Sequence, residues 1–387
     1  MDDRTRSYLA GRFGDYYRSV SLSPPPDAHL REWGHIPWTP GPGTTMIRHN
    51  SAYDLGDFDT FFAEEAPRHA YFSAARYDDP GASTMSKKGW QSADLVFDLD
   101  ADHLPGVDPE TTSYKDMLEE CKAALDRLLA FLENDFAFED LTIVFSGGRG
   151  YHVHVRDESI RELDGEARRE IVDYVRAIDL DTENLIHTVT ERGTTKRVLR
   201  TNGGWGARVH EELVEYADRL RGMDESAARE ELMRLDGIGE GRAKTILGAF
   251  ERNPQAVREG NVEAGGPGVR RLVSALAAQV RATQTAPIDE PVTTDIRRLI
   301  RLPGTLHGGS GLVVTRIPRE EFDDFDPLVD AIPERFVGRE IAIETDAERT
   351  VELSGKRVSV PSGRSNVPEF VGIFLMTRGE ARKAPEQ

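Results

Sequence analysis

The sequence predicts an α/β (α+β) fold, in which segments of strand and helix pattern follow one another along the chain. Segments of strand pattern occur at 93–103, which begins apolar and ends in carboxylates, and at 141–145 and 151–155. Between the first two, residues 114–134 place apolar side chains at i, i+3 and i+4, the spacing of an amphipathic helix. From 209 to 283 the composition changes to helix formers. These three observations indicate a sheet-containing body interrupted by a helical segment.

The bulk composition is that of a globular protein with a sizeable core. A chain of 387 residues is long enough for two or more domains. No apolar run approaches membrane-spanning length, and the N-terminal residues lack a signal-peptide core. The single cysteine excludes an intramolecular disulfide. We therefore expect a cytoplasmic protein that does not enter a membrane.

The net charge of −19 would by itself argue against a polyanionic partner. However, acidic residues are spread over the whole chain and lysine is scarce beside arginine, as expected of a protein adapted to very high salt. At molar salt the Debye length is about 3 Å, so local arginine clusters matter more to a ligand than the global charge. Nucleic acid is therefore not excluded as a partner, and we expect the protein to need salt to stay folded.

The first ninety residues alternate between helix and strand patterns. We expect helices at 4–20 and 54–65, a strand at 69–77, and a hairpin made by 30–38 and 44–49. Glu32 and Arg48 are the notable polar residues of this hairpin. Taken alone, each is better explained as an ordinary exposed strand charge.

The segment Ala93–His103 (ADLVFDLDADH) is predicted to be a strand that ends in carboxylates. Strand alternation places Asp98 and Asp100 on one face and the apolar side chains at 95, 97 and 99 on the other. Same-face residues lie about 7 Å apart, so both carboxylates could reach one metal cluster. The alternative is a strand end running into an acidic, solvated turn.

Residues 141–155 form a predicted strand, tight loop and strand, with SGGRG as the loop. Glycines let successive backbone N–H groups turn inward as an anion-binding nest. Ser146, Arg149 and His152 can surround the same point, which favours a phosphate site. The loop lacks the GK[ST] ending of a Walker A motif, and an ordinary glycine-rich hairpin is the alternative.

Residues 160–177 are predicted to form an amphipathic helix, residues 187–206 an irregular stretch, and residues 209–283 further helices. Gly237-Ile238-Gly239 lies between two amphipathic helices and resembles a helix-hairpin-helix, whose amides contact DNA phosphates. A plain αα-hairpin with a glycine cap is the alternative. Glycine-rich spacing recurs at 263–268.

The segment 288–317 is predicted to form a short strand carrying Asp289, a helical turn capped by Thr294 or Asp295, a sharp LPG turn and a closing strand. Basic side chains crowd this segment, namely Arg297, Arg298, Arg301 and His307. Such crowding is costly without an anion, although a solvated basic helix face is the alternative. A sheet-like stretch follows at 335–360, and the polar C-terminus is expected to be mobile.

Three segments, DLVFDLDAD, SGGRGYHVHV and DEPVTTDIRRLIRLPGTLHGGSGL, stand in an order and spacing that closely resemble the catalytic (small) subunit of archaeal/eukaryotic-type DNA primase. The resemblance runs from about residue 4 to about 345, and the composition suggests a halophilic archaeon. It implies a discontinuous primase core with a mixed sheet at 1–208 and 284–360. A helical insert at 209–283 and a C-terminal tail at 361–387 complete the expected organisation.

The resemblance also implies the site residues. Asp98, Asp100 and Asp289 match the family's catalytic, metal-binding aspartates. The nucleotide-binding positions that it implies are Ser146, Arg149, His152, Arg301, His307, Glu32 and Arg48. Arg298 could join the phosphate contacts. Asp102, in the same acidic run, has no apparent partner and is left outside the site.

The expected cofactors are two Mg²⁺ or Mn²⁺ ions, which would support template-directed synthesis of short RNA or DNA primers from nucleoside triphosphates. The expected partners are single-stranded DNA and a large iron–sulfur subunit, which together with this chain would form a heterodimer. The family's Cys/His zinc knuckle has only His103 and Cys121 in the corresponding interval, so structural zinc is expected to be absent. Alternatives are another D-x-D metal-dependent nucleotidyl- or glycosyltransferase, and a non-catalytic template-binding subunit.

Overall fold

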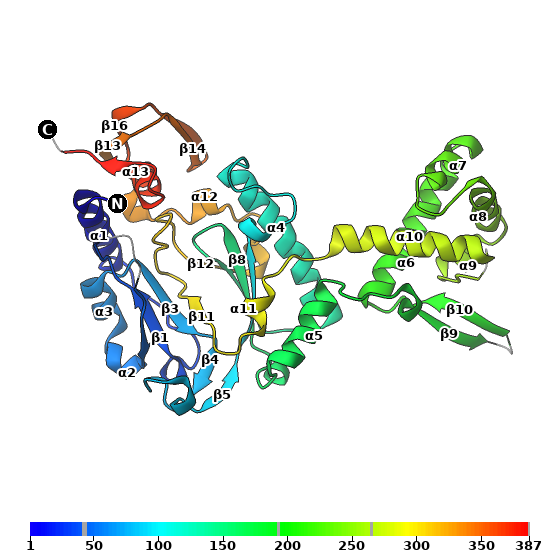
Figure 1. Cartoon of the computed structure of the whole chain (residues 1–387), viewed down its shortest axis with the longest axis horizontal. Helices are drawn as coiled ribbons and strands as arrows, with labels where there is room; N and C mark the ends of the chain where they lie inside the picture. The colour runs from blue at the N-terminus through cyan, green and yellow to red at the C-terminus, as the bar shows by residue number, and fades with distance from the viewer. Residues whose placement is uncertain (41–44, 192–193, 264–265, 386–387) are drawn as a thin grey trace. The chain divides into compact units, whose positions relative to one another are not determined.

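The computed structural model describes residues 1–40, 45–191, 194–263 and 266–385. The chain divides into two compact units. The first contains Met1–Leu125, Glu139–Val172 and Pro287–Gln387, and the second contains Asp126–Phe138 and Asp173–Ala286. The second unit is thus larger than the helical insert expected at 209–283, because it also takes in a helix end and a strand hairpin. Helices and sheets coexist in the first unit, which confirms the α+β class (Figure 1).

The elements that belong to the first unit, or begin in it, follow in chain order. Its helices are α1 (Asp3–Tyr17), α2 (Ala52–Leu55), α3 (Phe58–Glu65), α4 (Tyr114–Ala130), α5 (Gly165–Val175), α11 (Glu290–Thr294), α12 (Pro327–Asp330) and α13 (Glu369–Thr377). Its strands are β1 (Trp33–Ile36), β2 (Ile47–Asn50), β3 (His69–Ser73), β4 (Ala75–Tyr77), β5 (Trp90–Ala93), β6 (Leu95–Asp100), β7 (Leu141–Phe145), β8 (Gly150–Val155), β11 (Leu299–Arg301), β12 (Thr315–Ile317), β13 (Glu340–Thr345), β14 (Arg349–Leu353), β15 (Lys356–Val360), β16 (Gly363–Pro368) and β17 (Arg382–Lys383).

Two four-stranded sheets position the predicted site. One has the strand order β12-β7-β8-β6 and the other β11-β3-β1-β2. The core was expected to be a mixed sheet, but every strand pair in the described residues is antiparallel. The apolar face of β6 is completely buried, and the Cys121 thiol of α4 donates a hydrogen bond to the Leu99 carbonyl at 3.4 Å. Cys121 is therefore a core residue, as its place on the apolar stripe of the predicted helix indicates.

The segment that carries Asp289 differs from its prediction. Asp289 was expected in a strand but lies at the N-cap of α11, a short helix with Pro291 in its first turn, where proline is well tolerated. The expected cap residue Asp295 follows the end of α11. In the basic run beyond it, Arg297 and Arg298 are exposed and lie outside any helix, while Arg301 lies in β11, which pairs with β3. The alternative of a basic helix face is therefore wrong.

A buried charge network lies at the start of β6. The Asp94 carboxylate is fully buried and contacts three guanidinium groups, those of Arg31 at 2.9 Å, Arg76 at 2.9 Å and Arg156 at 3.2 Å. Several buried cations around one carboxylate are costly to desolvate unless the geometry is good, so removing the shared anion should be strongly destabilising. The network ties β4, the segment just before β1 and the residue just after β8 to the start of the strand that bears the predicted metal ligands.

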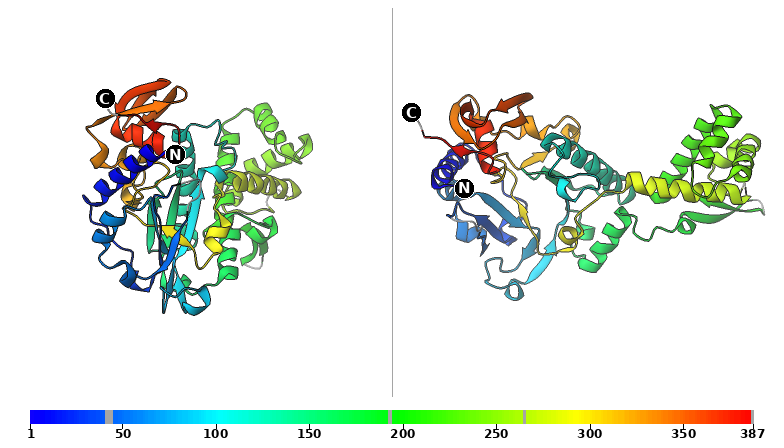
Figure 2. Two further views of the ribbon diagram at one scale, coloured as in Figure 1. Left: turned by 60° about the vertical axis from the view of Figure 1, so that its left-hand side comes forward. Right: turned by 45° about the horizontal axis from the view of Figure 1, so that its top comes forward.

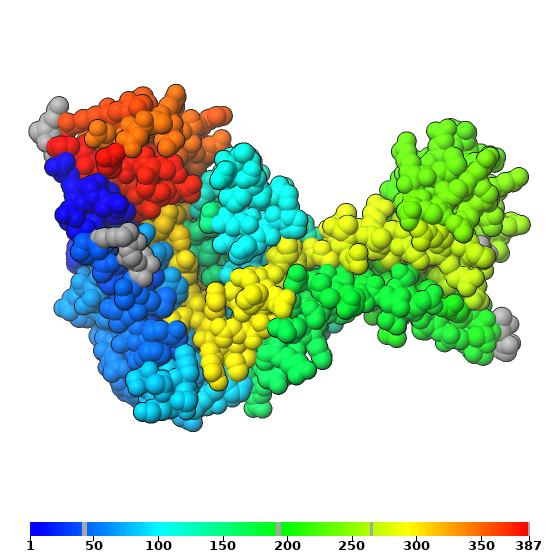
Figure 3. All heavy atoms as spheres, viewed as in Figure 1, coloured from blue at the N-terminus to red at the C-terminus, as the bar shows by residue number. Residues whose placement is uncertain are grey.

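The C-terminal segment is folded, which corrects the expectation of a mobile tail. Residues 363–368 pair with β13, and α13 is buried along most of its length. The amide of Lys383 donates to the Thr5 hydroxyl at 2.9 Å, and Arg12 pairs with Glu369 at 2.9 Å. The two ends of the chain therefore lie side by side (Figures 2 and 3). The apolar run FVGIFLM in α13 explains why this segment is buried and not mobile.

The second unit is a helical assembly with one strand hairpin. Its elements are β9 (Ile186–Glu191), β10 (Thr194–Leu199), α6 (Gly204–Arg221), α7 (Glu225–Met233), α8 (Glu240–Arg252), α9 (Pro254–Arg258) and α10 (Gly266–Gln284). The stretch 187–206 was expected to be irregular, yet most of it is this hairpin, since its threonines and valines suit strands. The glycine-rich spacing expected at 263–268 falls partly outside the described residues.

The predicted hairpin at Gly237–Gly239 does connect two helices. It joins α7 to α8, with Ile238 buried and Gly239 at the N-cap of α8. Gly237 has a φ of +74°, a left-handed conformation that glycine adopts without strain. A Cβ atom there would also lie 2.2 Å from Nε of Arg271. The turn thus has a structural reason for glycine, and whether it contacts DNA stays a prediction.

Candidate active site

Asp98 and Asp100 lie at the end of β6, opposite β8. In the antiparallel register Asp98 pairs with His152, and Asp100 pairs with Gly150. Asp98 Oδ1 lies 3.3 Å from His152 Nε2. Burial by itself would raise the pKa of Asp98, but attraction to His152, Arg298 and Arg301 outweighs it and leaves the pKa lowered. Asp98 is therefore an ionised carboxylate with only 24 % of its side chain exposed.

The SGGRG loop turns between β7 and β8 as predicted. The Ser146 amide donates to the Gly150 carbonyl at 2.9 Å and closes the loop. Gly147 has a φ of +75°, and a Cβ there would lie 2.6 Å from the Cβ of His307. A Cβ at Gly150 would lie 2.0 Å from the Leu99 carbonyl oxygen across the strand pair. Glycine is thus required where the loop approaches its neighbours.

Arg301 is held from the neighbouring sheet. Its Nη1 lies 2.7 Å from His69 Nδ1 and 3.2 Å from the Tyr71 hydroxyl, both on β3. Burial, together with the charges of Arg301 and Arg68, lowers the pKa of His69 to about 2. His69 is therefore neutral and accepts the guanidinium hydrogen bond, which fixes where Arg301 points.

His307 lies on the loop after the LPG turn. Its Nδ1 is 3.1 Å from the Ser310 hydroxyl, and Ser310 in turn bonds to the Gly147 carbonyl. Burial, reinforced by the charge of Arg301, lowers the pKa of His307 well below its usual range. The two loops that the sequence places far apart are thus joined directly through Ser310.

One pocket of about 460 Å³ collects seven of the predicted site residues. They are Asp98, Asp100, Ser146, Arg149, His152, Arg301 and His307. Sequence reasoning missed four further residues of its wall, Tyr114, Ser310, Thr377 and Arg378. Ser310 lies in the third of the three segments quoted above, with no role predicted for it, whereas Tyr114, Thr377 and Arg378 lie outside all three, so only their positions in the fold reveal them. Carboxylates on β6 therefore face basic and hydroxyl groups from four other segments, which are the β7–β8 hairpin, the stretch 301–310, α4 and the end of α13.

Asp289 adjoins this pocket through its backbone. Its amide donates to the Asp98 carbonyl at 2.9 Å, so the third predicted acid lies next to the first. It is not among the residues that line the pocket. Within the described ranges, no group of three or more His, Cys, Asp or Glu side chains is arranged to hold a metal ion. The structure thus places Asp98 and Asp100 in one pocket, whereas Asp289 contacts Asp98 through a backbone hydrogen bond.

Glu32 and Arg48 form a pair beside the pocket. The Glu32 carboxylate is fully buried and accepts hydrogen bonds from Arg48 Nε at 2.9 Å and the His49 amide at 3.0 Å. Lys88 Nζ lies 3.7 Å from its other oxygen. Arg48, in contrast, lines a neighbouring pocket of about 420 Å³ together with Asp98, Arg298 and Arg301. Arg48 is therefore the member of the pair that a ligand could contact, and the buried Glu32 holds the Arg48 guanidinium in position.

Asp102 does have a partner, which corrects the sequence interpretation. Its carboxylate forms an ion pair with Arg149 of the SGGRG loop. Strand alternation breaks at Ala101, where a short 3-10 turn begins, and this turn returns Asp102 towards the loop. The ion pair sets the position of an arginine that the sequence assigns to phosphate binding.

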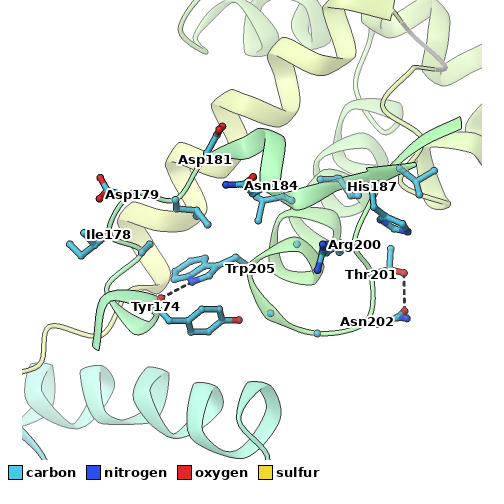
Figure 4. Close-up of a pocket in the computed structure, with 18 of the residues that line it drawn as sticks. Tyr174, Ile178, Asp179, Asp181, Asn184, His187, Arg200, Thr201, Asn202 and Trp205 are labelled. Carbon is cyan, nitrogen blue, oxygen red and sulfur yellow. Dashed lines mark hydrogen bonds between the residues drawn. The ribbon is translucent and has the colours of Figure 1, made fainter. Parts of the chain in front are cut away.

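A larger pocket, of about 900 Å³, lies within the second unit (Figure 4). Trp205 lies near its centre, and the indole Nε1 donates to the Tyr174 carbonyl at 2.8 Å. Arg200 is the single arginine or lysine among its lining residues, against four carboxylates. That balance disfavours a polyphosphate, and none of the predicted site residues lies there. The smaller pocket of the first unit is therefore the candidate active site.

In this α+β core, a strand that bears carboxylates faces a glycine-rich loop and several basic side chains. The arrangement is that of a protein suited to binding a phosphorylated ligand. Residues 97–318 match the family described as DNA primase small subunit. The chain is 80 % identical over its full length to the DNA primase small subunit PriS of Halorubrum lacusprofundi, and the match also covers all of that protein. It is 55 % identical to that of Haloarcula marismortui and 38 % identical to that of Methanococcoides burtonii, again over the full length of both chains.

The chain belongs to the DNA primase small subunit family. It is a catalytic subunit of a DNA primase and acts in DNA replication. The halophilic composition agrees with the salt-adapted archaea of its similar relatives. No helix in the described ranges is both long and apolar enough to cross a membrane.

Proposed function

We propose that the pocket around Asp98 and Asp100 is the centre at which this primase subunit joins nucleoside triphosphates into short primers along single-stranded DNA. The observation that carries the proposal is the shared pocket, in which two carboxylates face Arg149, Arg301 and His307. Phosphoryl transfer is catalysed mainly by positioning and charge stabilisation, and this pocket offers groups of both signs. The reaction would be a nucleotidyl transfer that releases pyrophosphate.

Asp98 and Asp100 would hold the Mg²⁺ or Mn²⁺ ions, with Asp289 as the third acid. The donor set fits, because carboxylate oxygens are the preferred ligands of these hard cations and the lowered pKa keeps Asp98 ionised. When bound, the metal ions would activate the attacking 3′-hydroxyl and stabilise the leaving pyrophosphate.

The chain's own basic groups would bind and orient the triphosphate. Arg301 is held by His69 and Tyr71, so its guanidinium needs little rearrangement when phosphate enters. His307 is neutral in the free protein because of its lowered pKa, and it would serve as a hydrogen-bonding group more than as a charge. Arg149, which is positioned by its ion pair with Asp102, would contact the phosphates from the SGGRG loop.

The expected partner comes from the family resemblance, which implies a large subunit with an iron–sulfur cluster in a heterodimer. The single cysteine of this chain cannot ligate such a cluster, so the cluster would belong to the large subunit. Structural zinc is expected to be absent, because Cys121 is buried in the core and His103 is exposed. The heterodimer would work in the cytoplasm. Metal analysis of the purified chain tests the expectation for zinc, and a stoichiometric amount would overturn it.

Primer synthesis on a single-stranded template tests the proposed function. We expect Asp98→Ala with Asp100→Ala to abolish synthesis while largely keeping the fold. Asp116→Ala, which removes an exposed acid from α4, is the matched control and should stay active. Synthesis that persists in the double variant would remove the catalytic assignment. A wild-type chain that binds template but makes no primer would instead favour a non-catalytic template-binding subunit.

A further inference from the structure

The helix α13 contributes to the wall of the candidate active site although it lies outside the residues matched by the family. The match ends at residue 318, whereas Thr377 and Arg378, at the end of α13, line the pocket that contains Asp98 and Asp100. Arg378 is thus a cationic side chain placed on the phosphate side of the pocket by the folded C-terminal segment. The sequence motifs give no reason to expect it there.

The position of Arg378 is well defined by its neighbours. Its guanidinium carbon lies 4.9 Å from the centre of the Tyr114 ring and 5.2 Å from that of the Phe374 ring. Its Nε donates a hydrogen bond to Glu380 at 2.7 Å. Stacking on two rings and a bond at Nε fix the plane of the guanidinium and leave its terminal amino groups for another partner.

Tyr114 connects Arg378 to the SGGRG loop. Its hydroxyl donates to the Gly148 carbonyl at 2.5 Å, and its ring packs edge-on against Phe374 with centroids 5.2 Å apart. Burial raises the pKa of Tyr114, so the hydroxyl keeps its proton and remains a donor. Arg378, Tyr114 and Gly148 therefore form one continuous chain of contacts.

The second loop of the pocket also packs on α13. Gly311 has a φ of +73°, and a Cβ there would lie 2.6 Å from Cγ2 of Ile373. The 307–311 loop therefore approaches α13 more closely than a side chain would allow. The 307–311 loop therefore packs directly on the helix that precedes Arg378, and the SGGRG loop is connected to that helix through Tyr114.

We propose that Arg378 binds the phosphates of the incoming nucleoside triphosphate. The inference rests on the proposed function, because it assigns a further contact to the same site. A planar guanidinium held at the edge of the pocket can form two parallel hydrogen bonds to a phosphate group. It supplies positive charge from a different segment than Arg301 does, and both arginines line the same pocket, so two segments would bind the polyphosphate.

Binding measurements on the full chain test this inference. We compare wild type, Arg378→Ala and Arg378→Lys, with Arg382→Ala as a matched control that removes an exposed arginine paired with Asp346. Affinities for a nucleoside triphosphate and for the corresponding monophosphate are measured by calorimetry, and KM and kcat by primer synthesis. Arg378→Ala should weaken triphosphate binding ~10-fold or more and raise KM, with partial recovery in Arg378→Lys. Monophosphate affinity and the control should change by less than about 2-fold.

The outcomes separate this inference from the proposed function. If Arg378→Ala binds triphosphate as tightly as wild type, the inference is overturned while the proposed function stands. A lower melting temperature with unchanged KM would show that Arg378 only supports the fold, and that result also overturns it. A wild-type chain that neither binds triphosphate nor makes primers would overturn the proposed function itself.

Discussion

Asp98 and His152 face each other across the β6–β8 strand pair, with Oδ1 and Nε2 3.3 Å apart. The imidazole is one of the groups that keep a poorly solvated carboxylate ionised. Replacing it leaves the burial of Asp98 without this opposing attraction, and its pKa should rise.

We therefore expect His152→Ala to lower primer synthesis by about 10- to 1000-fold, the range seen when one preorganised electrostatic group is lost. The rate is measured at saturating template and nucleotide. His103→Ala, which changes an exposed histidine, is the control. Equal rates for both variants would contradict a role for His152 in the site.

Glu32 and Arg48 should differ in what their loss affects. Glu32→Ala leaves the buried Lys88 and the Arg48 guanidinium without their shared anion, and should lower the free energy of unfolding by about 3 kcal/mol. Arg48→Ala removes a partly exposed cation, and the buried Glu32 carboxylate keeps Lys88 and the His49 amide as partners, so the loss should be smaller, about 1–2 kcal/mol. Because Arg48 lines a pocket that contains Asp98, its loss should raise the KM for nucleotide. A stable Glu32→Ala protein with a raised KM would instead mean that Glu32 contacts the nucleotide directly.

The glycine at the first turn of the SGGRG loop offers a test of packing. Gly147→Ala forces a side chain into a left-handed conformation and towards His307, so we expect a loss of about 2–4 kcal/mol. Gly338 also has a positive φ, but a Cβ there would meet nothing within 4 Å. Gly338→Ala should therefore cost only about 1 kcal/mol. Denaturant unfolding measures the free energy of unfolding of both variants. Equal losses would show that the close approach to His307 adds nothing to the cost of a side chain at position 147.

The buried His69 makes stability depend on pH. Its pKa is about 2 in the folded protein and about 6.5 when unfolded, so the unfolded state binds the proton more readily. The free energy of unfolding then falls as the pH drops below about 6.5, by ~1.4 kcal/mol per pH unit for this group.

His69→Asn keeps a hydrogen-bond acceptor near Arg301 but does not titrate. Between pH 7.5 and pH 5, at constant molar KCl, wild type should lose about 2 kcal/mol more than this variant. Denaturant unfolding at the two pH values measures the difference. Parallel losses would mean that His69 does not remain neutral in the folded protein.

The parts of the site that lie within one local pattern could be predicted from the sequence. Alternation in β6 places Asp98 and Asp100 on the same side, and the glycines between β7 and β8 require a tight turn. These depend on strand periodicity and backbone sterics, which act over a few residues. The same local rules placed Cys121 in the core.

Features that depend on long-range packing could not be predicted. Asp289 lies at a helix N-cap because α11 packs against β6, not because of its neighbours in sequence. Arg378 reaches the pocket only because α13 is buried against the rest of the unit, and the apolar run FVGIFLM indicates that burial but not which residues the helix end will face. The pairing of Asp102 with Arg149 needs both the turn after β6 and the loop after β7.

The carboxylate of Asp94 and its three arginines are shut off from solvent, unlike the acidic surface that dominates the net charge. At molar salt, mobile ions screen the attraction between exposed charges over a distance of about 3 Å. They cannot enter the buried interior, so they do not screen this network. This network should therefore stabilise the start of β6 equally well at low and at molar salt concentration. An organism whose internal salinity fluctuates would gain a strand for the candidate active site whose alignment is independent of ionic strength, even while the stability of the whole protein varies with ionic strength.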